Sequence, residues 1–140
     1  MIVRDAQPAD LLALNRLIGE LGYPLDDAEF RERFARVAGA STHHVFVAED
    51  KGEVVGLLHV FERPALEKHC DAVVQTLVVD SRHRSGGVGE ALMHAAEAWA
   101  AERHLEATSL YTSIKRERAH AFYERLGYQI EGTSHLMRRS

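Results

Sequence analysis

The stretch 77–89 joins an apolar strand end to a helix through a basic, glycine-rich loop. Its sequence is Leu77-Val78-Val79-Asp80-Ser81-Arg82-His83-Arg84-Ser85-Gly86-Gly87-Val88-Gly89. The helix is expected from Val88 to about Glu102, because apolar residues recur along it at intervals of three and four. The first turn of a helix presents unpaired N–H groups and the positive end of the helix dipole. The loop therefore suits a phosphate group, because its glycines let a ligand approach the backbone and Arg82 and Arg84 are further donors.

Two common phosphate-binding motifs do not fit this loop. The chain has no G-x-x-x-x-G-K-[ST] sequence, and Leu92 stands where the dinucleotide fingerprint has its third small residue. Arg84-Ser85-Gly86-Gly87-Val88-Gly89 instead resembles the R/Q-x-x-G-x-G/A signature of the GCN5-related N-acetyltransferases (GNAT). Downstream, Ala119-His120-Ala121-Phe122-Tyr123-Glu124-Arg125-Leu126-Gly127-Tyr128 resembles that family's A-x-x-F-Y-E-x-x-G-F segment. With both motifs in the family's order, the chain is identified by resemblance as a GNAT member over nearly its whole length.

Length and composition indicate one globular domain spanning residues 1–140, since a chain of 140 residues that is 46% hydrophobic can bury a core. A net charge of -4 argues against a nucleic-acid-binding protein, which needs a basic surplus. No apolar run approaches the roughly 20 residues that span a bilayer, so no membrane segment is expected. A cytoplasmic location is expected, because the single Cys70 excludes an internal disulfide and the first residues do not resemble a signal peptide.

The hydrophobic pattern predicts seven strands and four helices. The strands are expected at residues 2–4, 45–49, 54–62, 72–79, 107–112, 128–130 and 134–138, and the helices at 8–21, 26–38, 88–102 and 117–126. This order matches what the resemblance implies, which is an α/β (α+β) fold with a mixed, mostly antiparallel seven-stranded sheet flanked by four helices.

The resemblance implies transfer of an acetyl group from acetyl-CoA to a primary amine of a small molecule, directly within a ternary complex. The backbone of Leu77, Val78 and Val79 would line the pantetheine arm, and a bulge near Val79 would direct N–H groups at the thioester carbonyl. The pyrophosphate would be held by the loop and the first helical turn, namely Arg84, Ser85, Gly86, Gly87, Val88, Gly89 and Glu90. Arg116 stands where the family often has an Asn that contacts the cofactor, and Arg116 or Ser113 is the candidate replacement.

Tyr123 occupies the family's general-acid position, from which a phenol can protonate the departing thiolate of CoA. The alternative is a tyrosine that only packs in an apolar helical stripe. The general base is open among four side chains whose titration ranges could serve, His59, Glu62, His69 and Asp71.

No metal site is expected from the nine histidines. His43 and His44 are adjacent, so in a strand they point to opposite faces. The run His69-Cys70-Asp71 lacks a second cluster at the spacing that zinc sites use.

The sequence defines the acceptor less closely. Val74–Val79 and Thr112–Tyr123 resemble the aminoalkylphosphonate N-acetyltransferases within the family. An anionic acceptor is favoured by basic residues on segments that border the family's acceptor side, Arg63, Lys68, His69, Lys115 and Arg116. An aminoglycoside would instead be suited by the acids Asp26, Asp27, Glu62 and Asp71. The alternatives are therefore an aminoglycoside or protein N-terminal acetyltransferase, or a non-catalytic CoA-binding regulatory module.

Two further expectations come from the resemblance. In the family the two N-terminal helices wall the acceptor site, so Tyr23, Asp26, Asp27 and Phe30 are candidate acceptor contacts or, alternatively, capping and core residues. Small members of the family also imply a homodimer for this chain.

Overall fold

The sheet contains five strands in the spatial order β1-β2-β3-β4-β5, and the computed structural model describes all 140 residues. The first four strands are antiparallel neighbours, β1 Ile2–Asp5, β2 His43–Asp50, β3 Glu53–Arg63 and β4 Asp71–Val79. β5, Thr108–Leu110, runs parallel to β4, because a helix carries the chain back across the sheet between them. The sheet is mixed and mostly antiparallel, as expected, but it has five strands rather than seven.

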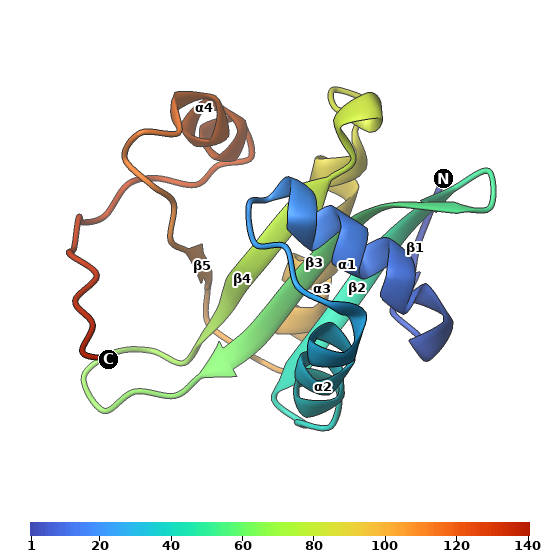
Figure 1. Cartoon of the computed structure of the whole chain (residues 1–140). Helices are drawn as coiled ribbons and strands as arrows, with labels where there is room; N and C mark the ends of the chain where they lie inside the picture. Colours follow the sequence, from blue (N-terminus) through green and yellow to red (C-terminus); the bar gives the residue numbers. More distant parts are fainter.

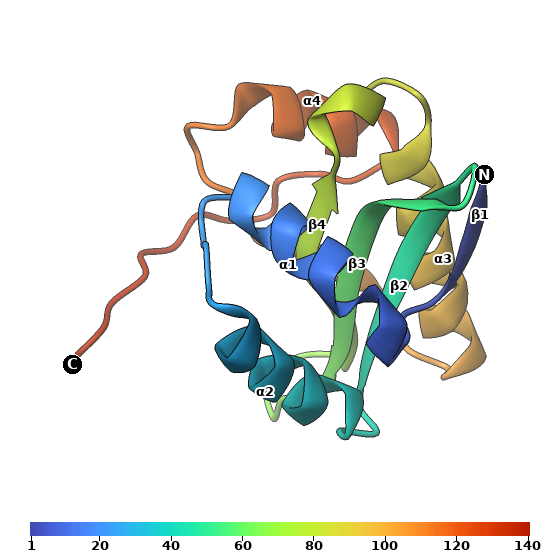
Figure 2. The same ribbon diagram turned by 45° about the vertical axis from the view of Figure 1, so that its right-hand side comes forward.

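Helices cover both faces of this sheet (Figures 1 and 2). On one face lie α1 Leu11–Glu20, which follows a 3-10 turn at Pro8–Asp10, and α2 Asp27–Ala38. On the other face lies α3 Val88–Glu102. α4, Glu117–Arg125, lies close to the beginning of α3 (Figure 2). The four α-helices confirm the predicted number, and none has the length and apolar character needed to cross a membrane.

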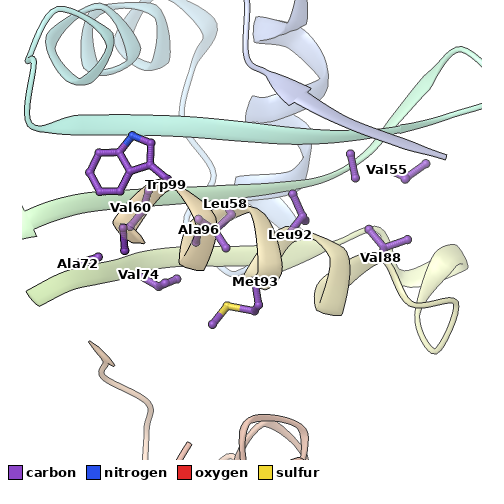
Figure 3. Packing of buried hydrophobic residues seen from close by; sticks show 12 residues of the cluster. Val55, Leu58, Val60, Ala72, Val74, Val88, Leu92, Met93, Ala96 and Trp99 are labelled. Atoms are coloured by element: carbon purple, nitrogen blue, oxygen red, sulfur yellow. The ribbon is translucent and has the colours of Figure 1, made fainter. Parts of the chain in front are cut away.

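Each face of the sheet has its own apolar core. Figure 3 shows the core on the α3 side, where Leu92, Met93, Ala96 and Trp99 of the helix pack on Leu58, Val60 and Val74 of the strands. On the other side, Leu14 and Leu17 of α1 pack on Val47, Leu57 and Val78. Burying a side chain of this size contributes about 1.5–3 kcal/mol, so the two cores hold the sheet between α1 and α3.

A β-bulge at Gln75 interrupts β4. Thr76 pairs with His59 and Val74 pairs with Val60, so Gln75 has no partner in β3. Residues an even number apart share one face of a regular strand. Here Val78 packs in the α1 core and Val74 in the α3 core, because the extra residue reverses the alternation.

β4 and β5 separate directly after this bulge. Their pairing ends with Val74 and Leu110, so the edge of β4 from Gln75 to Val79 has no strand beside it. The chain leaves β5 toward α4 instead of continuing along β4 (Figure 1). The backbone groups on this edge are therefore available to a ligand in extended conformation.

The strands predicted at residues 128–130 and 134–138 are not formed, and the strand predicted at 107–112 is limited to Thr108–Leu110. A strand is stable only beside a partner edge, and residues 129–140 are exposed and run away from the sheet (Figure 2). Tyr128 is instead held against α3, since its hydroxyl donates a hydrogen bond of 2.6 Å to Glu97 Oε2.

Candidate functional site

The loop between β4 and α3 presents a row of free backbone donors. Ser85 has a φ of 69°, and Gly87, the N-cap of α3, has a φ of 81°, a left-handed conformation that glycine adopts without strain. The first backbone hydrogen bond of the helix is donated by Ala91 to Gly87 O. The N–H groups of Gly87, Val88, Gly89 and Glu90 therefore have no acceptor in the chain, which fits a phosphate group at this helix terminus.

Asp80 anchors the base of this loop and is almost fully buried, with 1% of its surface exposed. Its carboxylate accepts hydrogen bonds from Arg82, through the backbone N at 3.0 Å and through Nη2 at 3.0 Å, and from Arg16 Nη1 at 3.1 Å. These bonds, first among them that from the Arg82 side chain, hold the pKa of Asp80 well below its usual range. Asp80 is thus ionised at neutral pH.

The two arginines of the loop differ in their freedom to bind a ligand. Arg82 is engaged by Asp80 and also donates to Glu53 Oε1 at 3.1 Å, so it has a structural role in the loop. Arg84 is exposed and has neither a hydrogen bond nor an ion pair from its side chain. Arg84 therefore remains the cation available to a phosphate. Together with Met1, Asp50 and His83, the loop borders an open cavity of about 350 Å³.

Gly89 is needed for the packing of α4 on α3. A Cβ at this position would lie 3.1 Å from Cζ of Phe122, closer than ordinary contact. The ring of Phe122 in turn meets that of Tyr123 edge to face, with centroids 5.0 Å apart. The absence of a side chain at Gly89 thus lets the helix that carries Tyr123 lie close to the β4–α3 loop.

Tyr123 is half-buried beside the α3 core, and its ring also meets Tyr128 edge to face at 6.0 Å. Burial raises the pKa of Tyr123, and the charge of Arg116 opposes this only in part. The hydroxyl makes no hydrogen bond within the chain. Tyr123 is therefore a protonated phenol with a free proton to donate.

In the segment before α4, the side chain of Arg116 is free, whereas that of Ser113 is hydrogen-bonded. Arg116 is exposed at the N-cap of α4, with its side chain in no capping bond. Ser113 is occupied within the loop, since its Oγ accepts from Lys115 N at 3.3 Å and its carbonyl accepts from Arg116 N at 3.0 Å. Of the two candidates to replace the family's Asn, only Arg116 has a free side chain.

The strand bulge lies at a different residue from the one expected. It is at Gln75, not near Val79, which keeps its regular pairing with Gly56. Leu77 and Val79 direct their side chains to the α3 core and Val78 to the α1 core. At the open edge, these three residues therefore present their backbone groups rather than their side chains.

A second cavity, of about 100 Å³, lies between α1, α2 and the sheet, and we call it the acceptor pocket after the role expected for the α1–α2 region. Its walls are mostly apolar, and its polar side chains are Arg33, His59 and Thr76. The lining residues are Leu14, Ile18, Phe30, Arg33, Phe34, Val37, Val45, Leu57, His59 and Thr76. Thr76 is next to the bulge, so the pocket reaches β4 where the open edge begins.

Only one of the candidate acceptor contacts from the α1–α2 region lines this pocket. Phe30 does so, whereas Asp26 caps α2 by accepting from Glu29 N at 2.8 Å. Asp27 accepts from Asn15 Nδ2 at 2.9 Å, and Tyr23 is largely exposed. Sequence reasoning missed Arg33, although its place in the helical stripe of Phe30 and Val37 was a usable signal.

Of the four candidate bases, His59 alone lines the acceptor pocket. Glu62 accepts from Arg103 Nε at 2.6 Å, and Asp71 lies 3.7 Å from Arg63. His69 contacts Glu106. These three side chains are therefore committed to partners outside the pocket.

The basic residues expected to favour an anionic acceptor do not gather in one place. Arg63, Lys68 and His69 lie at or in the β3–β4 connection, whereas Lys115 and Arg116 precede α4 (Figures 1 and 2). In both views these segments lie at opposite ends of β4. These five basic residues therefore form two separate groups, one at each end of β4.

Comparisons with known proteins identify relatives of this chain in sequence and in fold. An aminoalkylphosphonate N-acetyltransferase from Salmonella typhimurium is 35% identical over 130 residues, covering 91% of this chain and 84% of that protein. A putative acetyltransferase from Agrobacterium tumefaciens superposes with a TM-score of 0.90 at 25% identity, over 99% of this chain and 100% of that one. The aminoglycoside N-acetyltransferase AAC(6′)-Iy, solved with CoA, has a TM-score of 0.90 at 16% identity, over 99% and 93% of the chains.

The last of these likenesses shows the fold alone, whereas the family is established by the sequence itself. The profile of the acetyltransferase (GNAT) family matches residues 11–128, so this chain belongs to that family of acetyl-CoA-dependent N-acetyltransferases.

Proposed function

We propose that residues 1–140 form one catalytic domain that acetylates the primary amine of a small, anionic aminoalkyl compound by direct transfer in a ternary complex. The observation that carries this proposal is the position of Thr76. It lines the acceptor pocket and is the neighbour of Gln75, where the open edge of β4 begins. An amine in the pocket and an extended thioester along the edge would therefore meet at one point, as direct transfer requires.

Acetyl-CoA supplies an acetyl group activated as a thioester, and the chain offers groups that suit each part of it. The unpaired backbone of Leu77, Val78 and Val79 would pair with the amides of the pantetheine arm. The free N–H groups from Gly87 to Glu90 and the guanidinium of Arg84 would bind the pyrophosphate, with Ser85 and Gly86 shaping the turn. Arg116, exposed near Tyr123, is the proposed replacement for the Asn contact.

Tyr123 is proposed as the general acid of the reaction. As the amine nitrogen bonds to the acetyl carbon, the carbon–sulfur bond breaks and the sulfur gains negative charge. The Tyr123 hydroxyl would donate its proton to that sulfur, which its raised pKa and the absence of another hydrogen-bond partner support.

The size and charge of the acceptor pocket support a small amine with an anionic group. About 100 Å³ holds a short alkyl chain but not an aminoglycoside, and Arg33 is the only charged side chain in the lining. The Salmonella relative is named as an aminoalkylphosphonate enzyme, whereas the aminoglycoside enzyme shares the fold at 16% identity.

A panel of amines assayed by CoA release tests this function. We expect aminoalkylphosphonates to give the highest kcat/KM, followed by amino acids, with polyamines, aminoglycosides and peptide N-termini much lower. Polycations acetylated in preference to anionic amines would contradict the acceptor class and leave the acetyltransferase assignment intact. CoA binding without release from any amine would favour a regulatory module.

We also propose that the protein acts in the cytoplasm as a homodimer. Free Cys70 fits a reducing compartment. Ile130, Leu136 and Met137 are 68%, 83% and 88% exposed, and a second copy is a means of covering them.

A further inference from the structure

His59 and His43 form a hydrogen-bonded pair of imidazoles at the wall of the acceptor pocket. Nε2 of His59 lies 2.8 Å from Nδ1 of His43. The His43 ring stacks on Phe61, with centroids 5.1 Å apart and planes inclined by 13°. His59 lines the pocket, whereas His43, also half-buried, lies outside its lining. His43 is partly exposed, so the pair connects the pocket wall with a ring that solvent can reach.

The surroundings keep His59 uncharged. Burial, and secondarily His43, lower its pKa to about 4. Among the residues that line the pocket with His59, α1 contributes only Leu14 and Ile18, and β4 contributes Thr76. α2 contributes Arg33, which is paired with Glu29 at 2.8 Å. A neutral imidazole has a free lone pair, and the same apolar pocket favours the uncharged, nucleophilic form of a bound amine.

We propose that His59 accepts the proton that the amine nitrogen loses, and that His43 passes this proton to solvent. This role rests on the proposed function. As the nitrogen–carbon bond forms and the carbon–sulfur bond breaks, the nitrogen gives one proton to Nδ1 of His59. His59 gives its Nε2 proton to Nδ1 of His43, and His43 gives its Nε2 proton to water. Both rings end neutral with their protons on Nδ1, and exchange with water returns these protons to Nε2 before the next turnover. The sulfur takes its proton from Tyr123, and the resulting phenolate regains a proton from water.

This transfer does not need a strong base. A nitrogen that has bonded to a carbonyl carbon is far more acidic than a free alkylammonium ion, so a weakly basic imidazole can accept its proton. The route requires that both rings carry their proton on Nε2 at rest. In that state His59 Nε2–H donates to His43 Nδ1, as the 2.8 Å contact allows, and Nδ1 of His59 has no partner within the chain.

Three variants test the proposal with the best acceptor from the panel. His59→Gln should lower kcat by about 10²- to 10⁴-fold, with acetyl-CoA affinity unchanged by calorimetry. His43→Phe keeps a ring against Phe61 but removes the neighbour that lowers the pKa of His59. It should therefore lower kcat less and move the acid limb of the kcat/KM profile to higher pH, which a purely structural residue would not do. His44→Gln, on the opposite face of β2 and 2.7 Å from Asp5, is the control and should behave as wild type.

Nitrogen-15 NMR of the unmodified protein gives a readout that does not depend on the variants' folding. His59 should be neutral at pH 7 with its proton on Nε2, and a charged ring or a proton on Nδ1 would overturn the proposal. Wild-type kcat in a folded His59→Gln protein would also overturn it while leaving the proposed function standing. A wild-type protein that acetylates no amine would instead refute the proposed function and this role together.

Discussion

Arg16 Nη1 lies 3.1 Å from Oδ2 of Asp80, so α1 is tied directly to the first residue after β4. The same Asp80 carboxylate holds Arg82 in the next turn. One buried acid thereby connects the helix that walls the acceptor pocket with the loop that presents free donors for a phosphate. We infer that this contact fixes the relative positions of the two halves of the site.

Replacing Asp80 by Asn should loosen this connection. Because hydrogen bonds to a charged group contribute about 1.5–3 kcal/mol, Asp80→Asn should lower the free energy of unfolding by about 2 kcal/mol in urea denaturation. Acetyl-CoA affinity should fall as well. Glu32→Gln, in an exposed pair with Arg36 at 3.6 Å, is the matched control and should change neither quantity.

Asp80→Asn should also change how the stability of the protein depends on pH in the acid range. The pKa of Asp80 in the folded protein is below its ordinary value of 3.8, so its stabilising contribution is present above that value and lost as the pH falls below it. The wild type should therefore lose stability between about pH 5 and pH 2, and Asp80→Asn should lose less over this range. Parallel stability curves for the two proteins would show that Asp80 is not the group responsible.

Substitutions of the two loop arginines should have different effects, one on acetyl-CoA affinity measured by calorimetric titration and the other on stability. Arg84→Ala should weaken binding by about tenfold, the effect of losing one charge-assisted contact of roughly 1.4 kcal/mol, and should leave stability unchanged. Arg82→Ala should chiefly lower stability, because Arg82 holds Asp80 and Glu53. Gly87→Glu combines a strained left-handed φ of 81° with an anion at the phosphate position and should abolish binding. Full affinity in Gly87→Glu would remove the basis of the cofactor site.

Tyr123→Phe should retain acetyl-CoA affinity but lower kcat by about 10²- to 10⁴-fold, because it removes the hydroxyl group that donates the proton and little packing volume. Since burial raises the Tyr123 pKa above its ordinary value of 10.0, the wild type should keep its activity up to at least that pH, until the phenol loses its proton. Tyr128→Phe is the control, because it removes the hydroxyl that holds Glu97 and should affect stability more than kcat. An unchanged rate in Tyr123→Phe, measured by single turnover, would assign the proton donor elsewhere.

The sequence predicted the elements that carry strong periodicity. α3 was found from its apolar stripe, and the β4–α3 loop from its glycines, because these signals are local. The seven-strand count failed because strands at 128–130 and 134–138 need a partner edge, which no local pattern reveals. The bulge at Gln75 and the engagement of Arg82 by Asp80 depend likewise on contacts across the fold. His59 was one of four open candidates, and the packing of α1 on β3 and of α2 on β2 places it in the pocket wall.

Arg33 should determine which amines the protein accepts. It lines the acceptor pocket from α2, and its Nη2 is 2.8 Å from Glu29 Oε1, so an anionic acceptor would replace or join that carboxylate. Arg33→Gln should raise the KM for an aminoalkylphosphonate by about tenfold or more, while the KM for an uncharged alkylamine of the same length stays constant. Glu29→Gln, which frees the guanidinium, should lower the KM for the phosphonate. Arg36→Gln lies one turn nearer the end of α2, with a side chain 80% exposed, and is the matched control. If Arg33→Gln raises the KM for both amines equally, Arg33 shapes the pocket but does not distinguish an anionic amine from an uncharged one. If it changes neither, the anionic group binds elsewhere.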